Sequence, residues 1–164
     1  CGIVGKEGRL LEIVPFLPTE ESAYSYVVSK YKDITLCSGC LKEPKEAIEK
    51  YLAGERMDFE FSLDISRYTE FQRAVWEITR SISYGDIRTY SWVSKKLGKP
   101  NSSRAVGTAL AKNPLPIVVP CHRIIRSNGE LGGYSAEGGI DIKGKLLKME
   151  GHKFDAKGRL HIFY

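Results

Sequence analysis

The pattern of hydrophobic and polar positions changes about two fifths of the way along the chain. In the first part, short apolar runs broken by glycine and proline predict strands at 2–4 and 9–16. Residues 58–65 alternate apolar with acidic or polar side chains, which predicts a strand with one solvated face. Helices are expected at 20–32 and 44–53. The first part of the chain is therefore predicted to mix α and β structure.

Helical periodicity dominates the remainder. Thr69 and Gln72 have the spacing of a capping box, and apolar residues then recur at helical intervals as far as Ile82. Two shorter helices are predicted at 90–97 and 102–112, with a glycine and a proline in the turn between them. Two short helices around a tight turn match the helix-turn-helix plan.

The charge of the chain changes at the same place. Residues 1–67 hold 9 Lys and Arg against 12 Asp and Glu, whereas residues 68–164 hold 16 against 8. A length of 164 residues suffices for one ordinary domain or two small ones. We therefore predict an N-terminal α/β structural domain over 1–67 and a basic C-terminal domain over 68–164. The basic charge permits a nucleic-acid partner without requiring one.

Composition argues against several classes of protein. The longest apolar runs, such as 115–120, are far shorter than the roughly 20 residues of a membrane-spanning helix. The first residues lack the basic and apolar regions typical of a signal peptide, and four cysteines are too few for a disulfide-rich scaffold. We therefore expect a cytoplasmic protein without a membrane partner, working as a monomer.

Cys37 and Cys40 form a C-x-x-C pair with three interpretations: unlinked structural cysteines, a disulfide, or half of a zinc site. Zinc needs two further ligands. Cys1 is a candidate, but no histidine occurs in the first 121 residues. We favour the first interpretation, keep the disulfide as an alternative, and predict no metal site.

An apolar run at 116–120 leads into Cys121, His122 and Arg123. A thiolate is a nucleophile whose formation needs a base or a positive charge nearby, and these two neighbours offer both. Adjacent side chains on a strand point to opposite faces, so a direct contact between the cysteine and the histidine requires a turn or a bridging water. Taken alone, such a pair is more often structural than catalytic.

The helix predicted at 102–112 is unusually rich in small residues, with Arg104 near its start. Close packing against a neighbouring helix is one explanation. The alternative is that small residues let the helix enter a DNA groove while Arg104 projects between base steps, as in proteins that act from the minor groove.

Five motifs follow one another in the second part of the chain: Tyr84-Gly-Asp-Ile-Arg-Thr-Tyr90, Arg104-Ala-Val-Gly107 with Asn113-Pro114, Pro120-Cys-His-Arg123, Gly132-Gly-Tyr-Ser135 and Leu146-Leu-Lys-Met-Glu-Gly-His152. In this order they resemble the O6-alkylguanine-DNA alkyltransferases, also called methylated-DNA–protein-cysteine methyltransferases. The resemblance covers 68–164 almost continuously, and the first 67 residues have no comparable match. It implies an α+β fold with an N-terminal ribonuclease H-like sheet-and-helix domain. The C-terminal domain is then a mainly helical, winged-helix-like helix-turn-helix domain.

The resemblance also implies direct DNA repair with no cofactor. Cys121 accepts the alkyl group of O6-alkylguanine and keeps it, so that each chain acts once. Glu150, His122 and a water form the relay that removes the thiol proton. Tyr90 donates a proton or hydrogen bond to the leaving guanine, and Asn113 braces the turn before the cysteine.

The implied partner is double-stranded DNA containing O6-alkylguanine, with the damaged nucleotide flipped out because the reacting atom is inaccessible inside the duplex. Arg104 is expected to fill the gap left by that nucleotide. The residues assigned to substrate or DNA binding are Arg104, Ala105, Gly107, Ala109, Arg123, Ile124, Tyr134, Ser135 and Lys143.

Two departures from the family pattern and two alternative functions stay open at this point. Ala136 and Glu137 lengthen the loop that closes the pocket, and the alternating tail 160–164 is expected to add a strand. A transcription regulator without chemistry would bind DNA independently of Cys121. A Cys-His hydrolase would turn over, which a stoichiometric acceptor cannot.

Overall fold

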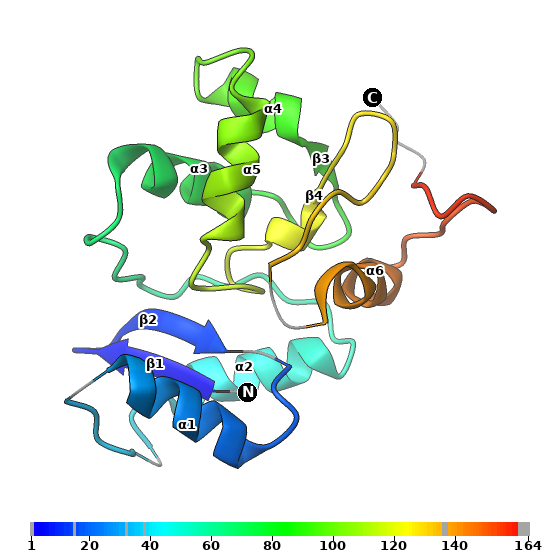
Figure 1. Ribbon diagram of the computed structural model, residues 1–164. Helices are drawn as coiled ribbons and strands as arrows, with labels where there is room; N and C mark the ends of the chain where they lie inside the picture. Colours follow the sequence, from blue (N-terminus) through cyan, green and yellow to red (C-terminus); the bar gives the residue numbers. More distant parts are fainter. Residues whose placement is uncertain (1, 15, 32, 38, 136–137, 161–164) are drawn as a thin grey trace.

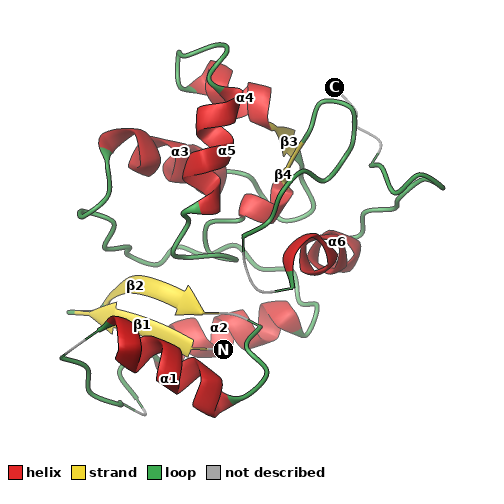
Figure 2. Cartoon of the chain, viewed as in Figure 1, coloured by secondary structure: helices red, strands yellow, loops and turns green. Residues whose placement is uncertain are grey.

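The computed structural model describes residues 2–14, 16–31, 33–37, 39–135 and 138–160 of the chain (Figure 1). The fold is mixed α/β, with helices around two small sheets in the described residues (Figure 2). Cys1, the Ala136–Glu137 insertion and most of the predicted tail strand lie outside these residues. Within them, Leu160 forms a single antiparallel bridge with Phe154.

The N-terminal part is a hairpin with two helices. Strands β1 (Gly2–Lys6) and β2 (Arg9–Val14) pair antiparallel, and they confirm the two predicted strands. Helix α1 (Glu20–Lys30) begins after Thr19, whose hydroxyl accepts the amide hydrogen of Ser22. Helix α2 (Lys42–Leu52) buries its apolar face. Figure 1 shows these four elements grouped at one end of the molecule.

The strand predicted at 58–65 is wrong for most of its length. Within this segment Leu63 makes an isolated parallel bridge to Leu10. The carbonyl groups of Phe59 and Phe61 accept hydrogen bonds from the guanidinium of Arg80 at 3.1 and 2.7 Å. A side chain thus satisfies acceptors that a neighbouring strand would otherwise pair, so the alternating pattern reports half-burial without a ladder.

The C-terminal part contains the remaining elements. They are α3 (Glu70–Arg80), β3 (Arg88–Thr89), α4 (Tyr90–Lys96), α5 (Ser103–Ala111), the 3-10 helix η1 (Cys121–Arg123), β4 (Ile124–Ile125) and α6 (Gly139–Met149). The capping box of Thr69 and Gln72 is present at the start of α3. Helices α4 and α5 pack together across a turn in which Gly98 and Asn101 have positive φ.

The apolar run before Cys121 is a tight turn, although its composition is strand-like. Val119 donates its amide hydrogen to the carbonyl of Leu115 at 2.8 Å. Ile117 lies inside this turn with φ of 78°, a conformation that costs a β-branched residue free energy, and it is 1% exposed. The amide of Ile13 in β2 donates to the carbonyl of Pro114 at 2.8 Å. The N-terminal hairpin therefore holds one end of this turn.

The two parts of the chain share one core. The main cluster of buried apolar side chains includes Leu10, Ile13, Ile48 and Tyr51 from the first part together with residues of α3, α5 and the turn before Cys121. No helix in the described residues is both long and apolar enough to cross a membrane.

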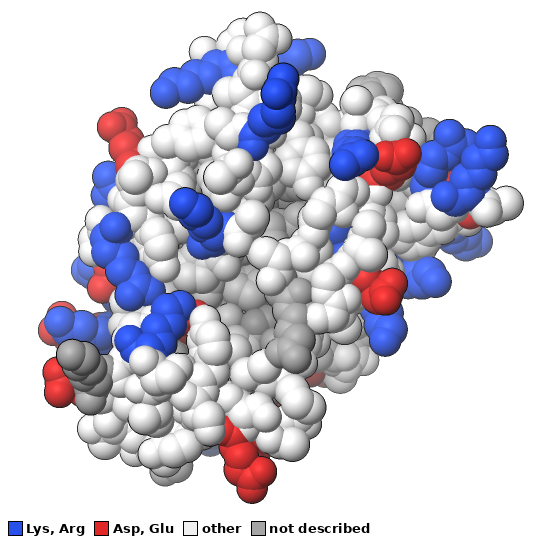
Figure 3. Space-filling view, viewed as in Figure 1, with Lys and Arg blue, Asp and Glu red and all other residues white. Residues whose placement is uncertain are grey.

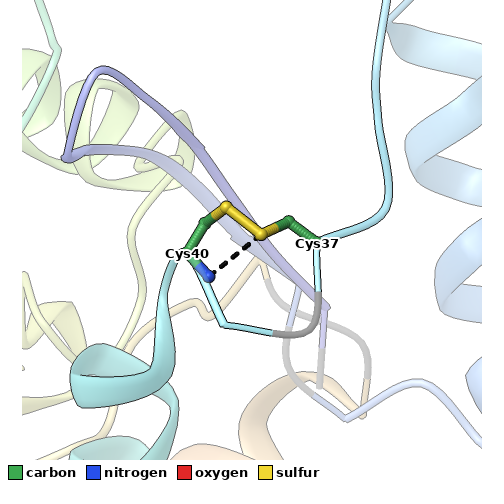
Figure 4. Close-up of a disulfide and its surroundings, with 2 residues drawn as sticks. All are labelled: Cys37 and Cys40. Atoms are coloured by element: carbon green, nitrogen blue, oxygen red, sulfur yellow. Dashed lines mark hydrogen bonds between the residues drawn. A yellow bond between two sulfur atoms is a disulfide. The ribbon is translucent and has the colours of Figure 1, made fainter.

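Cys37 and Cys40 are joined by a disulfide just before α2 (Figure 4). The amide of Cys40 also donates to Cys37 Sγ at 3.0 Å. The favoured interpretation of unlinked cysteines is therefore wrong, because the two-residue spacing lets the chain turn back and bring the sulfurs together. Among the described residues, no cluster of His, Cys, Asp and Glu is arranged to hold a metal ion.

Candidate active site

Cys121 is the first residue of η1 and is 7% exposed. Its sulfur accepts a hydrogen bond from Asn113 Nδ2 at 3.3 Å. Burial raises the pKa of the thiol, and the Asn113 hydrogen bond and the charge of Lys143 offset this only in part. The cysteine therefore rests as a thiol, and a nearby base is needed to generate the nucleophile.

Asn113 braces the turn that delivers the cysteine. Its Nδ2 also donates to the carbonyl of Val119 at 2.9 Å, and its Oδ1 accepts the amide hydrogen of Leu115 at 3.0 Å. One side chain thus links the start of the turn, its end and the sulfur. This geometry agrees with the role that the family resemblance implies for Asn113.

His122 and Glu150 lie together in the core, although 28 residues separate them in sequence. The carboxylate, just after α6, lies 3.0 Å from His122 Nε2. It also accepts the backbone amide hydrogen of Gly85, a turn residue with φ of 80°. The structure thus brings together the two side chains that the family resemblance assigns to the relay.

Arg123 completes the environment of this carboxylate. Its Nε and a terminal nitrogen both donate to Glu150, at distances between 2.9 and 3.1 Å. Burial alone would raise the pKa of Glu150, but the hydrogen bonds and charges of His122 and Arg123 lower it to about 2. Glu150 is therefore an ionised acceptor at neutral pH.

This ionisation fixes the tautomer of His122. A carboxylate can only accept, so Nε2 carries the hydrogen that it donates to Glu150. Burial lowers the pKa of His122 despite the opposing effect of Glu150, which keeps the ring neutral at pH 7. Nδ1 is then the unprotonated nitrogen, and it is buried with no hydrogen-bond partner among the described residues. It is the basic atom available to a proton relay.

A cavity of about 840 Å³ opens onto the sulfur. It lies between α5 and the segment 126–135, which face one another in Figure 1. Predicted site residues that line it are Tyr90, Arg104, Gly107, Cys121, Tyr134 and Ser135. A smaller cavity of about 330 Å³ also reaches Cys121, from the side of β2 and α1.

Tyr90 stands in the large cavity at the start of α4 and packs against two glycines. A Cβ at Gly132 would lie 2.8 Å from the Tyr90 hydroxyl, and Gly132 has φ of 72°, so glycine is required there on both counts. Burial, and secondarily a negative charge on Cys121, raise the pKa of Tyr90. The phenol therefore stays protonated and able to donate.

Lys143 lies behind this site and is fully buried. Its ammonium group donates to the carbonyls of Ile124 and Leu131, and it lies 6.0 Å from the centroid of the Tyr90 ring. Burial lowers its pKa to about 8. Neither Lys143 nor Ile124 lines the cavity in the described structure, so both support its wall.

Two binding assignments disagree with the structure. Arg123 is 3% exposed and committed to Glu150, so it cannot reach a DNA phosphate. Ala109 is buried, and its carbonyl accepts the indole hydrogen of Trp76, so it belongs to the core face of α5. Ala105, by contrast, is exposed. The small residues of α5 are therefore divided between a face in the core and an exposed face.

The site also contains residues that the sequence predictions omit, among them Arg126 and Tyr51. Arg126 lies on the rim of the large cavity. Tyr51, at the end of α2, contacts both His122 and Glu150. Its place on the apolar face of an amphipathic helix predicts burial, and a buried hydroxyl needs a partner. From the sequence one could therefore have expected the Tyr51 hydroxyl to form a buried hydrogen bond, but not that it forms one with Glu150.

The charge on the face that carries α5 is predominantly positive. Figure 3 shows Lys and Arg side chains distributed around α5 and the hollow beside it, with Asp and Glu mostly toward the margins. Arg104 is exposed on α5. Such a surface suits contacts with a phosphate backbone, because these depend on charge and not on base sequence.

Comparisons with known proteins agree on one family. Residues 70–152 match the model described as 6-O-methylguanine DNA methyltransferase, DNA binding domain. A methylated-DNA–protein-cysteine methyltransferase of Methanosarcina acetivorans is 47% identical over 110 residues, which cover 67% of this chain and 69% of that protein. The Mycobacterium leprae protein of the same name is 40% identical over 116 residues, covering 71% and 68%.

Solved structures extend the similarity over most of the chain. The Mycobacterium tuberculosis OGT in complex with DNA is 33% identical with a TM-score of 0.75, covering 91% of this chain and 85% of that one. The O6-methylguanine-DNA methyltransferase of Pyrococcus kodakaraensis is 27% identical with a TM-score of 0.68, covering 91% and 89%.

Proposed function

Because the chain belongs to the methylated-DNA–protein-cysteine methyltransferase family of DNA-repair proteins, we propose that Cys121 takes the alkyl group directly from O6-alkylguanine in DNA. The observation that carries this proposal is the arrangement of the sulfur. It lies at a cavity beside the DNA-binding helix α5, next to an ionised Glu150 and a neutral His122 with its Nδ1 unpartnered.

The chemistry is a single displacement. A water carries the thiol proton of Cys121 to His122 Nδ1, and Glu150 stabilises the resulting imidazolium through Nε2. The thiolate attacks the alkyl carbon, an S–C bond forms, and the C–O6 bond breaks with its electron pair leaving on the guanine. The thioether is stable, so the alkyl group stays on the protein and each chain acts once.

The leaving guanine gains negative charge, and the Tyr90 hydroxyl donates a proton or a hydrogen bond to it. A donor aimed at developing charge stabilises the transition state. Tyr90 lines the cavity with Cys121, and the missing side chain at Gly132 leaves room for its hydroxyl. Tyr134 and Ser135 close the pocket, and the backbone at Cys121 reads the guanine edge, whereas Ile124, which the resemblance also assigned to this task, lies behind the wall of the cavity.

Binding brings α5 against the minor groove of double-stranded DNA. The flipped nucleotide enters the large cavity, and Arg104 fills the space it leaves in the stack. Unstacking costs about a few kcal/mol, which the inserted side chain partly offsets. In this proposal residues 1–67 form a ribonuclease H-like domain, residues 68–164 form the helix-turn-helix domain, and a monomer in the cytoplasm carries out the repair.

Intact mass spectrometry tests the proposal. The protein is incubated with duplex DNA containing one O6-methylguanine, alongside the Cys121→Ala variant. We expect each wild-type chain to gain one methylene in mass, peptide mapping to place it on Cys121, and the variant to gain nothing. Binding of the DNA by the wild-type protein without any mass gain would contradict the proposal and support a regulator.

The number of substrate molecules processed per chain distinguishes the proposed alkyl transfer from a Cys-His hydrolase. A Cys-His hydrolase would process many substrate molecules per chain, whereas an alkyl acceptor stops at one. An excess of damaged DNA should therefore leave all damage beyond one lesion per chain unrepaired.

A further inference from the structure

Tyr51 is a residue of the N-terminal part whose side chain contacts both members of the proposed proton relay, His122 and Glu150. It lies in the last turn of α2, outside the residues that match the family model, and it is fully buried. Its hydroxyl donates to Glu150 Oε1 at 2.7 Å and lies 3.1 Å from His122 Nε2. These are the two side chains on which removal of the thiol proton depends.

The ring and the hydroxyl of Tyr51 have separable tasks. The ring packs edge-on against Phe59 and Tyr84, with centroids 5.7 and 6.1 Å away. That packing explains a buried aromatic residue but not its hydroxyl, because phenylalanine would fill the same space. The hydroxyl is explained by its hydrogen bond to the carboxylate.

We propose that Tyr51 is a positioning residue for alkyl transfer, and that its hydroxyl holds Glu150 and His122 in the arrangement that leaves Nδ1 free to accept the thiol proton. This inference rests on the proposed function of Cys121. The carboxylate has several donors, and that of Tyr51 comes from the other part of the chain. The N-terminal part thereby contributes directly to the catalytic geometry.

The hydroxyl also tunes the affinity of His122 for a proton. A hydrogen bond from Tyr51 draws negative charge from Glu150 Oε1, which weakens the stabilisation of the imidazolium. The charged or titratable groups around His122 are Glu150, Arg123, Lys143 and Tyr51. Burial and the charge of Glu150 raise the pKa of Tyr51, so its phenol stays a donor throughout the working pH range.

The test is the pH dependence of single-turnover methyl transfer for Tyr51→Phe. We expect a rate about tenfold lower on the pH plateau, the loss of one hydrogen bond to a charged group in a site that depends on geometry. We also expect the acidic limb of the profile to move to higher pH by about half a unit, because the imidazolium is better stabilised. The final extent should remain one methyl per chain.

Tyr31→Phe is the matched control. The Tyr31 hydroxyl also donates to a buried carboxylate, Glu12, within the N-terminal part, and neither residue is hydrogen-bonded to His122 or Glu150 in the described residues. Its loss should affect stability in the same way and leave the pH profile of transfer unchanged. A shift of the acidic limb in Tyr51→Phe but not in Tyr31→Phe separates positioning from general destabilisation.

A second variant keeps the test decisive if Tyr51→Phe folds poorly. Replacing Tyr51 with 3-fluorotyrosine retains the hydroxyl and makes it a stronger donor, so the acidic limb should move to lower pH. Wild-type rates and profiles in both variants would overturn the role of Tyr51 and leave Cys121 transfer intact. Failure of the wild-type protein to transfer any methyl would instead overturn the proposed function.

Discussion

The two parts of this chain differ in how much of their function can be inferred from sequence motifs. Residues 68–160 hold the motifs, the proposed nucleophile Cys121 and helix α5, whereas residues 2–67 show no motif of comparable specificity. Yet the first part donates the Tyr51 hydroxyl to Glu150 and the Ile13 amide to the turn before Cys121. Sequence motifs contain the residues proposed to react. The residues that position them, such as Tyr51 and Ile13, look in the sequence like any other buried residue.

The largest expected effect comes from Glu150→Gln, which removes the charge of a carboxylate that accepts hydrogen bonds from both parts of the chain. Gln cannot stabilise an imidazolium as a carboxylate does, so transfer should slow by about 10²- to 10⁴-fold. Arg123 is left as an unpaired buried charge, which should lower the free energy of unfolding by about 3–5 kcal/mol. Rapid-quench transfer assays and urea unfolding measure the two effects.

The same variant gives a pH test with a defined sign. The pKa of Glu150 in the folded protein, about 2, lies below its ordinary value of 4.5. Its stabilising contribution is therefore complete above about pH 4.5 and is lost as the pH falls toward 2. In Glu150→Gln this part of the acid unfolding curve should disappear. An unchanged curve would show that the carboxylate is not held in its charged form by the fold.

A smaller effect, confined to the C-terminal part, is expected from Arg104→Ala. Without a side chain to fill the stack, flipping costs more, and repair of duplex DNA should slow by roughly 10- to 100-fold, in line with a flipping cost of a few kcal/mol. Reaction with free O6-benzylguanine, which needs no flipping, should proceed at the wild-type rate. Equal losses on both substrates would contradict the finger role and place Arg104 in the chemistry.

The smallest effect should come from removing the disulfide of the N-terminal part with Cys37→Ser and Cys40→Ser. A loop this short constrains the unfolded chain only modestly, so the loss of stability should be about 2 kcal/mol or less. The transfer rate should be unchanged, because the disulfide does not contact the relay in the described structure. A slower rate in this variant would extend the catalytic role of the N-terminal part beyond Tyr51.

The sequence predicted the helices well, and the structure brings together several of the residues that the resemblance assigned to the site. The capping box at Thr69, the helix pair α4 and α5, and the meeting of His122 with Glu150 all occur as predicted. Local signals mark helix ends, and the family motifs mark the residues proposed to contact the substrate. These are features that short stretches of sequence specify.

The failures concern partners that lie far apart in sequence. The alternation at 58–65 predicted a strand, but Arg80 takes the carbonyls that a ladder needs. Arg123 was assigned to substrate or DNA binding, whereas in the structure its charge is paired with the buried carboxylate of Glu150. Tyr51 lies 71 residues from His122, and no local pattern announces such a contact.

The hydrogen bond from β2 to the turn before Cys121 joins a segment that is synthesised early to one that is synthesised late. Ile117 keeps a backbone conformation that costs about 1–3 kcal/mol, and the hydrogen bond from Ile13 to Pro114 helps to enforce it. Synthesis proceeds from the N-terminus, so the β1–β2 hairpin leaves the ribosome about a hundred residues before this turn does. The strand that contacts this turn is thus already synthesised when the cysteine is translated, and the nascent thiol can be enclosed as soon as its turn folds.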